Sequence, residues 1–323
     1  MTTQPGIWQY AQQLKPLVKS KFRLSLNEGH TKLNKINHLY FKREDQNPTG
    51  SVKDRGIAFQ ISFLMQKLSL PLSRGGKEGF SLNNINNEPK FVISSSGNAA
   101  ISAAAYCQQA KTELTIFVSP QIPKAKLQKL RQFPFKIITT KQPISQAYQY
   151  AKQNSAYNLR PSKDLLGPVG YQTIVFELLN QFKQSPEAIF IPTSSGTMLA
   201  GIAQGFHLLK KPLPKLYAIQ TTNCHPIAKK YDQDFKSENA SLATGIVAKV
   251  VPRKKQIHDF ISLSQGGAYV VSNQQIKSAH QWLKGKEINT SYEGAAALAG
   301  YKKAIKSNKK FNNVVILLTG SLF

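Results

Sequence analysis

A lysine in a turn of small and helix-breaking residues is the first candidate for chemistry in this sequence. Lys53 lies in the segment 47–56 (NPTGSVKDRG), and a helical pattern follows from Ile57. We therefore expect Lys53 at or near a helix N-terminus, whose positive end disfavours an ammonium group and lowers the lysine pKa. Such a lysine forms Schiff bases readily. In isolation, a surface lysine in a capped turn is the simpler explanation.

Two loops of small polar residues follow apolar runs and precede helical patterns. They contain Ser95, Ser96, Gly97 and Asn98 after the run 91–93, and Ser194, Ser195, Gly196 and Thr197 after the run 188–191. Backbone N–H groups at a helix start bind carboxylates and phosphates. Neither loop has the Walker or the Gly-x-Gly-x-x-Gly pattern. The loops therefore indicate two anion sites, with helix capping as the alternative for each.

Other catalytic sets are poorly represented in the sequence. The six histidines show no metal-binding spacing, and no Gly-x-Ser-x-Gly nucleophile motif occurs. Cys107 follows an alanine-rich helical pattern, which favours a place in the core. We therefore expect no metal site and no serine or cysteine nucleophile.

Composition narrows the class of protein further. The 323 residues, 41% of them apolar, are enough for two domains, and no apolar run is long enough to span a membrane. Two cysteines and a polar start without a secretory signal favour the cytoplasm. The net charge of +27 fits either a nucleic-acid or membrane-surface binder or a solvated basic surface. Because the lysines are spread along the chain, we favour the solvated surface and expect no nucleic-acid partner.

The elements that must position these residues alternate between strand and helix. Expected strands are 91–93, 114–118, 135–139, 188–191, 216–219, 268–271 and 314–318; expected helices are 98–109, 124–132, 144–154, 170–182, 198–209, 273–284 and 293–305. This alternation predicts an α/β fold of mostly parallel sheets with helices on both faces. Ligands in such folds bind beyond the carboxyl ends of strands, where Thr319 also lies. The segment 71–90 is expected to be an exposed loop.

Taken in order from about Arg23 to Ser321, these motifs resemble the fold-type-II pyridoxal-phosphate-dependent enzymes, the tryptophan synthase β-like family. The resemblance implies that Lys53 carries pyridoxal 5'-phosphate as a Schiff base and later acts as the base at the α carbon. It implies that the loop with Ser95, Ser96 and Gly97 binds the carboxylate of an amino-acid substrate. Asn98 would contact the ring oxygen of the cofactor.

The same resemblance implies roles for residues further along the chain. The segment 194–197 corresponds to the cup for the cofactor phosphate, with one glycine where the family has several. Thr319 would lie beside the pyridine nitrogen, and Glu293 near the ring. The family also implies a homodimer with two domains per chain: a smaller, mobile one of residues 38–150 and a larger one of residues 1–37 plus 151–323.

Subfamily motifs favour threonine synthase, although they are mixed. The segment 25–33 (SLNEGHTKL) resembles a threonine synthase motif with Lys32 in place of a proline, whereas Val52 is typical of cysteine synthases and the segment 42–45 of dehydratases. We therefore predict a lyase of threonine biosynthesis that converts O-phosphohomoserine to threonine, with Arg160 near the substrate phosphate. The alternatives are a threonine or serine dehydratase, a cysteine synthase-like enzyme, and a non-catalytic binder of pyridoxal phosphate or amino acids.

Overall fold

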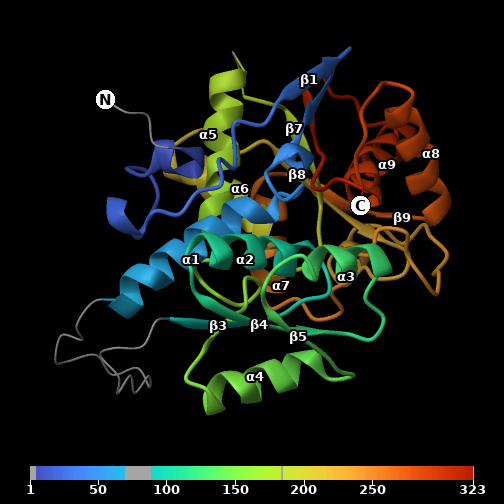
Figure 1. Ribbon diagram of the computed structural model, residues 1–323. Coiled ribbons are helices and arrows are strands. Elements are labelled where there is room, and N and C mark those ends of the chain that lie inside the picture. The colour runs from blue at the N-terminus through green and yellow to red at the C-terminus, as the bar shows by residue number, and fades with distance from the viewer. Residues whose placement is uncertain (1–4, 70–88, 183–184, 323) are drawn as a thin grey trace.

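The computed structural model describes residues 5–69, 89–182 and 185–322 of the chain. These residues form two sheets with helices on both faces of each, which confirms the predicted α/β class (Figure 1). The expected loop 71–90 lies almost wholly outside the described residues. None of the described helices is long and apolar enough to cross a membrane.

The larger sheet has the strand order β1-β2-β10-β7-β8-β9 within the described residues. The strands are β1 (Leu33–Ile36), β2 (Leu39–Lys42), β7 (Ala188–Pro192), β8 (Lys215–Thr221), β9 (Gly267–Val271) and β10 (Val314–Leu317). All neighbours are parallel except β1 and β2, which form an antiparallel hairpin through Asn37 at φ 55°. The fully buried central strands explain why their sequences are continuous apolar runs.

Helices cover both faces of the larger sheet and divide its core in two. Helices α5 (Gln172–Gln181), α6 (Thr197–Leu208) and α7 (Lys254–Leu263) pack on one face, and α8 (Asn273–Lys284) and α9 (Tyr292–Lys306) pack on the other. Side chains alternate across a strand, so Ile189 and Ile191 of β7 join one apolar cluster, and Phe190 joins the other.

The smaller sheet is wholly parallel, with the order β5-β4-β3-β6. Its strands are β3 (Lys90–Ser94), β4 (Glu113–Val118), β5 (Lys136–Thr139) and β6 (Tyr157–Leu159). One face is covered by α1 (Lys53–Ser69), α2 (Asn98–Gln109) and α3 (Lys124–Leu130), and the other by α4 (Pro143–Gln153), as Figure 1 shows. Ala100, Ala103 and Ala104 are fully buried, and their small side chains let α2 approach its neighbours closely.

Strand pairing does not follow the predicted domain boundaries at every point. The hairpin β1–β2, which spans residue 38, pairs with the larger sheet through β10. Strand β6, which follows residue 150, pairs with β3 in the smaller sheet. The division into residues 38–150 and the remainder stays a prediction.

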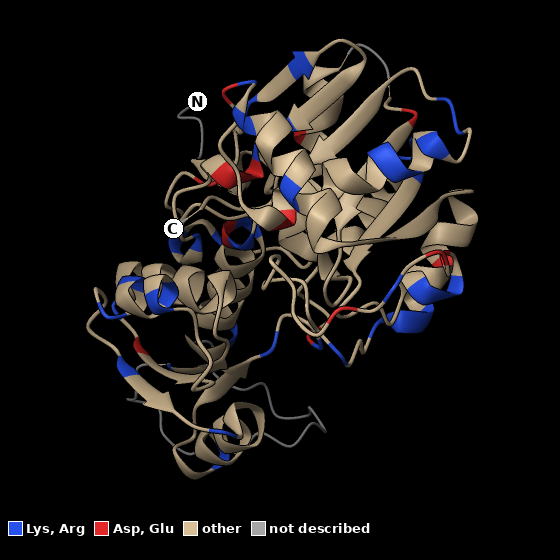
Figure 2. Cartoon of the chain, turned by 90° about the vertical axis from the view of Figure 1, so that its right-hand side faces the viewer, with Lys and Arg blue, Asp and Glu red and all other residues tan. Residues whose placement is uncertain are grey.

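Basic residues lie on both parts of the molecule. Figure 2 shows Lys and Arg on helices and loops around both sheets, with the fewer acidic residues among them. This spread accommodates the net charge of +27 without confining it to one element.

Candidate active site

A cavity of about 490 Å³ lies between the two sheets, at the carboxyl ends of β3, β6, β7 and β10. Its lining includes every site residue expected from the sequence: Lys53, Ser95, Ser96, Gly97, Asn98, Arg160, Ser194, Ser195, Gly196, Thr197, Glu293 and Thr319. The parallel topology explains this convergence, because strands that run the same way end at the same edge of a sheet. The individual roles of these residues stay predictions.

Lys53 is the first residue of α1, at the helix N-terminus that the turn 47–52 predicts. Its ammonium nitrogen Nζ lies 5.9 Å from the centre of the Tyr171 ring, and no described residue accepts a hydrogen bond from it. Burial lowers the pKa of Lys53. The direction agrees with the sequence-based expectation, and enclosure by protein is a cause that the sequence did not reveal.

The turn before Lys53 is held by the segment that follows β10. The backbone N–H of Val52 donates to the carbonyl of Thr319 at 3.1 Å, and the N–H of Ser321 donates to the carbonyl of Gly50 at 2.8 Å. These bonds join segments more than 260 residues apart in sequence. They place Thr319 and Lys53 in the wall of the same cavity.

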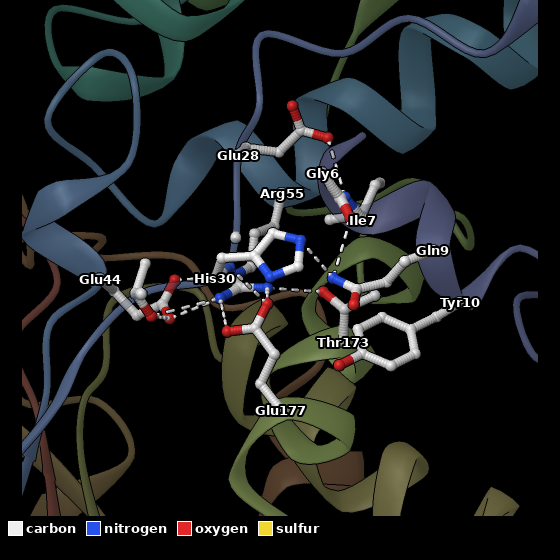
Figure 3. Close-up of polar contacts among 12 residues, drawn as sticks. Gly6, Ile7, Gln9, Tyr10, Glu28, His30, Glu44, Arg55, Thr173 and Glu177 are labelled. Carbon is white, nitrogen blue, oxygen red and sulfur yellow. Dashed lines mark hydrogen bonds and ion pairs between the residues drawn. The ribbon is translucent and has the colours of Figure 1, made fainter. Parts of the chain in front are cut away.

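A buried cluster of charged side chains holds the first turn of α1 in place, and Figure 3 shows Arg55 with its two carboxylate partners. Arg55 forms ion pairs of 2.7 Å with Glu44, which follows β2, and with Glu177 on α5. Lys42 at the end of β2 completes the cluster with a 2.7 Å ion pair to Glu177. All four side chains are at most 4% exposed, and the two cations balance the two carboxylates. The cluster therefore fixes the helix that carries Lys53 to the larger sheet.

The serine loop after β3 offers donors at the start of α2. The Oγ of Ser96 accepts from the N–H of Ser119 at 2.9 Å, and the N–H of Ser95 donates to the carbonyl of Phe117 at 3.1 Å. The loop is thereby tied to the end of β4. The Oδ1 of Asn98 is buried and has no hydrogen-bond partner in the described chain. A buried amide oxygen without a partner indicates a site that a ligand completes.

The loop after β7 is shaped by one glycine. Gly196 has a left-handed backbone with φ 82°, and a Cβ there would lie 2.5 Å from Cγ1 of Ile257. The hydroxyls of Ser195 and Thr197 share a 2.9 Å hydrogen bond, and Thr197 starts α6. The loop therefore presents hydroxyl and helix-start N–H groups, the donor set that binds a phosphate.

We predict that Gly196→Ala lowers the free energy of unfolding by roughly 1–3 kcal/mol, because it combines a left-handed backbone with the contact to Ile257. Urea denaturation of the cofactor-free protein measures the change. Gly285→Ala is the matched control, since Gly285 has φ −67° and an added Cβ would meet nothing closer than 3.6 Å. Equal stability of the two variants would contradict the role of the Gly196 backbone.

Several cavity residues were not anticipated from the sequence. The loop 245–248 is one such segment: the N–H of Gly245 donates a 2.6 Å hydrogen bond to the expected site residue Glu293, and the loop forms part of the cavity wall. Asn158 on β6 also lines the cavity, and its buried Oδ1 has no partner among the described residues. Tyr171 forms the wall beneath Lys53. Asn158 could not be predicted because β6 has only three residues, too few to show an alternating pattern. The helix-breaking Pro161 could have indicated that a loop begins after this strand.

The chain belongs to a family of pyridoxal-phosphate dependent enzymes, whose family model matches residues 23–320. The family depends on this cofactor, so pyridoxal phosphate is the cofactor of the chain. Threonine synthase of Methanocaldococcus jannaschii is 26% identical, over 98% of this chain and 80% of that protein. The catabolic L-threonine dehydratase of Staphylococcus aureus is 24% identical, over 94% of this chain and 83% of that protein.

Solved structures share the fold. The processed form of threonine deaminase isoform 2 from Solanum lycopersicum superposes with a TM-score of 0.74 at 19% identity, covering 100% of this chain and 93% of that one. At this identity the likeness concerns the fold alone.

The residues present fit pyridoxal phosphate. The cavity contains a partly buried primary amine at Lys53 and a cup of hydroxyl and N–H donors at 194–197. It also contains the amide oxygen of Asn98, which has no hydrogen-bond partner among the described residues. The amine could hold the aldehyde of the cofactor, the donors could hold its phosphate, and the amide oxygen could accept a hydrogen bond from its ring hydroxyl.

Proposed function

We propose that this chain is a threonine synthase, which converts O-phosphohomoserine and water into threonine and phosphate. The observation that carries the proposal is Arg160, a residue that lines the cavity and forms no ion pair with the described residues. The serine loop and the 194–197 cup account for the substrate carboxylate and the cofactor phosphate. Arg160 then remains for a third anion, which O-phosphohomoserine has and threonine or serine lacks.

The proposed roles follow from the positions of the residues. Lys53 would hold the cofactor and, once displaced by the substrate amine, remove the proton from the α carbon. When bound, pyridoxal phosphate supplies a sink for the electrons released at that carbon. The loop with Ser95, Ser96 and Gly97 would orient the substrate carboxylate.

The overall reaction balances without an oxidant. The bond between the γ carbon and the phosphate oxygen breaks, and phosphate leaves with the electron pair. Water then supplies a hydroxyl to the β carbon and its remaining proton to the released phosphate, while the β carbon loses one proton and the γ carbon gains one. Arg160 would bind phosphate in the substrate, and Thr319 and Glu293 would contact the cofactor ring from the larger sheet.

The deciding experiment offers the purified holoenzyme four substrates separately: O-phosphohomoserine, threonine, serine and O-acetylserine. Released phosphate, 2-oxo acid and newly formed amino acid are measured for each. The proposal requires phosphate and threonine in equal amounts from O-phosphohomoserine. Formation of 2-oxobutanoate from threonine without phosphate release from O-phosphohomoserine would identify a dehydratase instead, a second candidate that the similarity to threonine dehydratase favours.

We predict that Arg160→Met raises KM for O-phosphohomoserine by roughly 10- to 100-fold, because a charge-assisted hydrogen bond to phosphate is lost. Steady-state phosphate release measures the change. Arg131→Met is the matched control, since Arg131 is exposed at the end of α3 and does not line the cavity. If both variants keep the original KM, Arg160 does not bind the leaving phosphate.

The resemblance to fold-type-II pyridoxal-phosphate-dependent enzymes also supports the proposal that the active enzyme is a homodimer in the cytoplasm. Light scattering of the holoenzyme as it elutes from a size-exclusion column would test whether it is a dimer. A molar mass of one chain at micromolar concentration would contradict the proposal.

A further inference from the structure

Tyr171 is a buried aromatic residue that touches the reactive lysine and has no role in the function proposed above. It is 1% exposed, is the last residue of the 3₁₀ turn 169–171 directly before α5, and lines the cavity. The Nζ of Lys53 lies 5.9 Å from its ring centre, within the range of a cation–π contact.

The ring has little freedom to move, because two helices approach it where they carry glycine. A Cβ at Gly56 on α1 would lie 2.8 Å from Cζ of Tyr171, and a Cβ at Gly201 on α6 would lie 2.7 Å from its Cβ. A larger side chain at residue 56 would displace the ring, and one at residue 201 would displace the Cβ of Tyr171 and the carbonyl of Pro168. The space that holds Tyr171 therefore exists because both helices lack side chains there, and the ring spans the gap between them beneath Lys53.

Tyr171 can attract the ammonium group of Lys53 only through the face of its aromatic ring, because its phenol carries no charge. Burial raises the pKa of Tyr171 far above its ordinary value, and the carboxylates of Asp54 and Glu44 raise it further. The phenol is therefore neutral, and it forms no ion pair with Lys53. An aromatic face attracts an ammonium group while offering no lone pair that would compete for the proton.

Other charged groups near this ring are engaged elsewhere or lie across the cavity. Asp54 binds the N–H and hydroxyl of Thr49, and Glu44 and Glu177 pair with Arg55. Arg160 and Glu293 line the same cavity. No carboxylate in the described chain forms an ion pair with Lys53, and the Tyr171 ring is the cation–π contact of its side-chain nitrogen.

We propose that Tyr171 is a positioning residue for Lys53, whose ring face holds the lysine ammonium at the cavity wall whenever Lys53 carries a proton. Burial and the ring act in opposite directions on the amine. Burial disfavours the ammonium, and the ring face partly restores it, so that Lys53 can take up a proton and keep it near the α carbon. The inference depends on the proposed role of Lys53 but not on the identity of the substrate.

The test changes the electron density on the face of the ring at residue 171 and keeps the shape of the ring. Tyr171→Phe keeps the aromatic face, whereas 3,4,5-trifluorophenylalanine at the same position withdraws charge from that face with little change in volume. In the cofactor-free protein, the pKa of Lys53 is measured by trace labelling with acetic anhydride over a range of pH. Mass spectrometry of the peptide that carries residue 53 gives the extent of labelling.

We expect Tyr171→Phe to leave the pKa of Lys53 unchanged and the trifluoro variant to lower it by about 0.5 to 1.5 units. An unchanged or raised pKa in the trifluoro variant overturns the proposal. Thermal unfolding of both variants verifies that they fold. Because the two side chains have nearly the same shape, we expect nearly the same unfolding temperature for both variants. The measurement needs no substrate, so a pKa shift combined with inactivity on O-phosphohomoserine would refute the proposed function and leave this inference standing.

Discussion

Lys53→Ala is expected to abolish covalent attachment of pyridoxal phosphate and to lower turnover by roughly 1000-fold or more. Residue 53 would serve as both the attachment point and the proton-transfer group, and general acid–base catalysis alone contributes about 100- to 10,000-fold. The wild-type holoenzyme should absorb in the blue-violet region, and borohydride should fix the cofactor on the peptide containing Lys53. The variant should show neither property.

Lys67→Ala is the matched control for this experiment. Lys67 lies in the last turn of the same helix, is exposed, and does not line the cavity. It should keep both the absorbance and the borohydride-stable cofactor. Fixation of the cofactor on any other lysine of the wild-type protein would refute the assignment of Lys53.

Glu177→Gln is expected to lower the free energy of unfolding by about 3–5 kcal/mol, the usual cost of removing one partner from a buried ion pair. Glu177 accepts hydrogen bonds from Lys42, Arg55 and the N–H of His30, at 2.7 to 2.9 Å. The amide would leave two buried cations with only Glu44 as counter-charge. Urea denaturation of the cofactor-free protein at pH 7 measures the loss.

The same variant should change how stability depends on pH. Burial opposes the charge on Glu177, but Arg55 and then Lys42 outweigh burial and lower the pKa of its carboxyl below the ordinary 4.5. A lowered folded-state pKa means that the stabilisation is complete above about pH 4.5 and is lost as the pH falls below that value. The pH dependence in this acid range should therefore be weaker in Glu177→Gln than in the wild type.

An exposed ion pair provides the control for the buried one. Lys90 and Glu113 lie 3.3 Å apart with 41% and 68% of their side chains exposed. Glu113→Gln should cost less than about 1 kcal/mol, because solvent screens such pairs. Equal losses for Glu113→Gln and Glu177→Gln would show that the Arg55 cluster does not stabilise the fold.

The junctions between strands and helices could be predicted from the sequence because each has a strong local signal. Apolar runs such as 188–191 end abruptly in small polar residues, and helices begin within one residue of the expected positions at Asn98 and Thr197. The short elements lacked such signals. Strands β1, β2 and β6 have three or four residues each, and the amphipathic pattern of α7 is short.

The support around the cavity could not be predicted, because it depends on contacts distant in sequence. Arg55 meets Glu177 across 122 residues, and Lys42 meets it across 135. Nothing in the local sequence around Arg55 indicates a partner on α5. Tyr171 likewise stands in an ordinary apolar stretch, and only the glycines on two other helices explain its position beneath Lys53.

The bonds between the 50–52 turn and the segment 319–321 have a consequence for biosynthesis. The ribosome makes the lysine-bearing turn early, but the strand end that braces it is made almost 270 residues later. The nascent chain therefore cannot brace this turn until residue 321 has left the exit tunnel, so this wall of the cavity forms only after nearly all of the chain has been made.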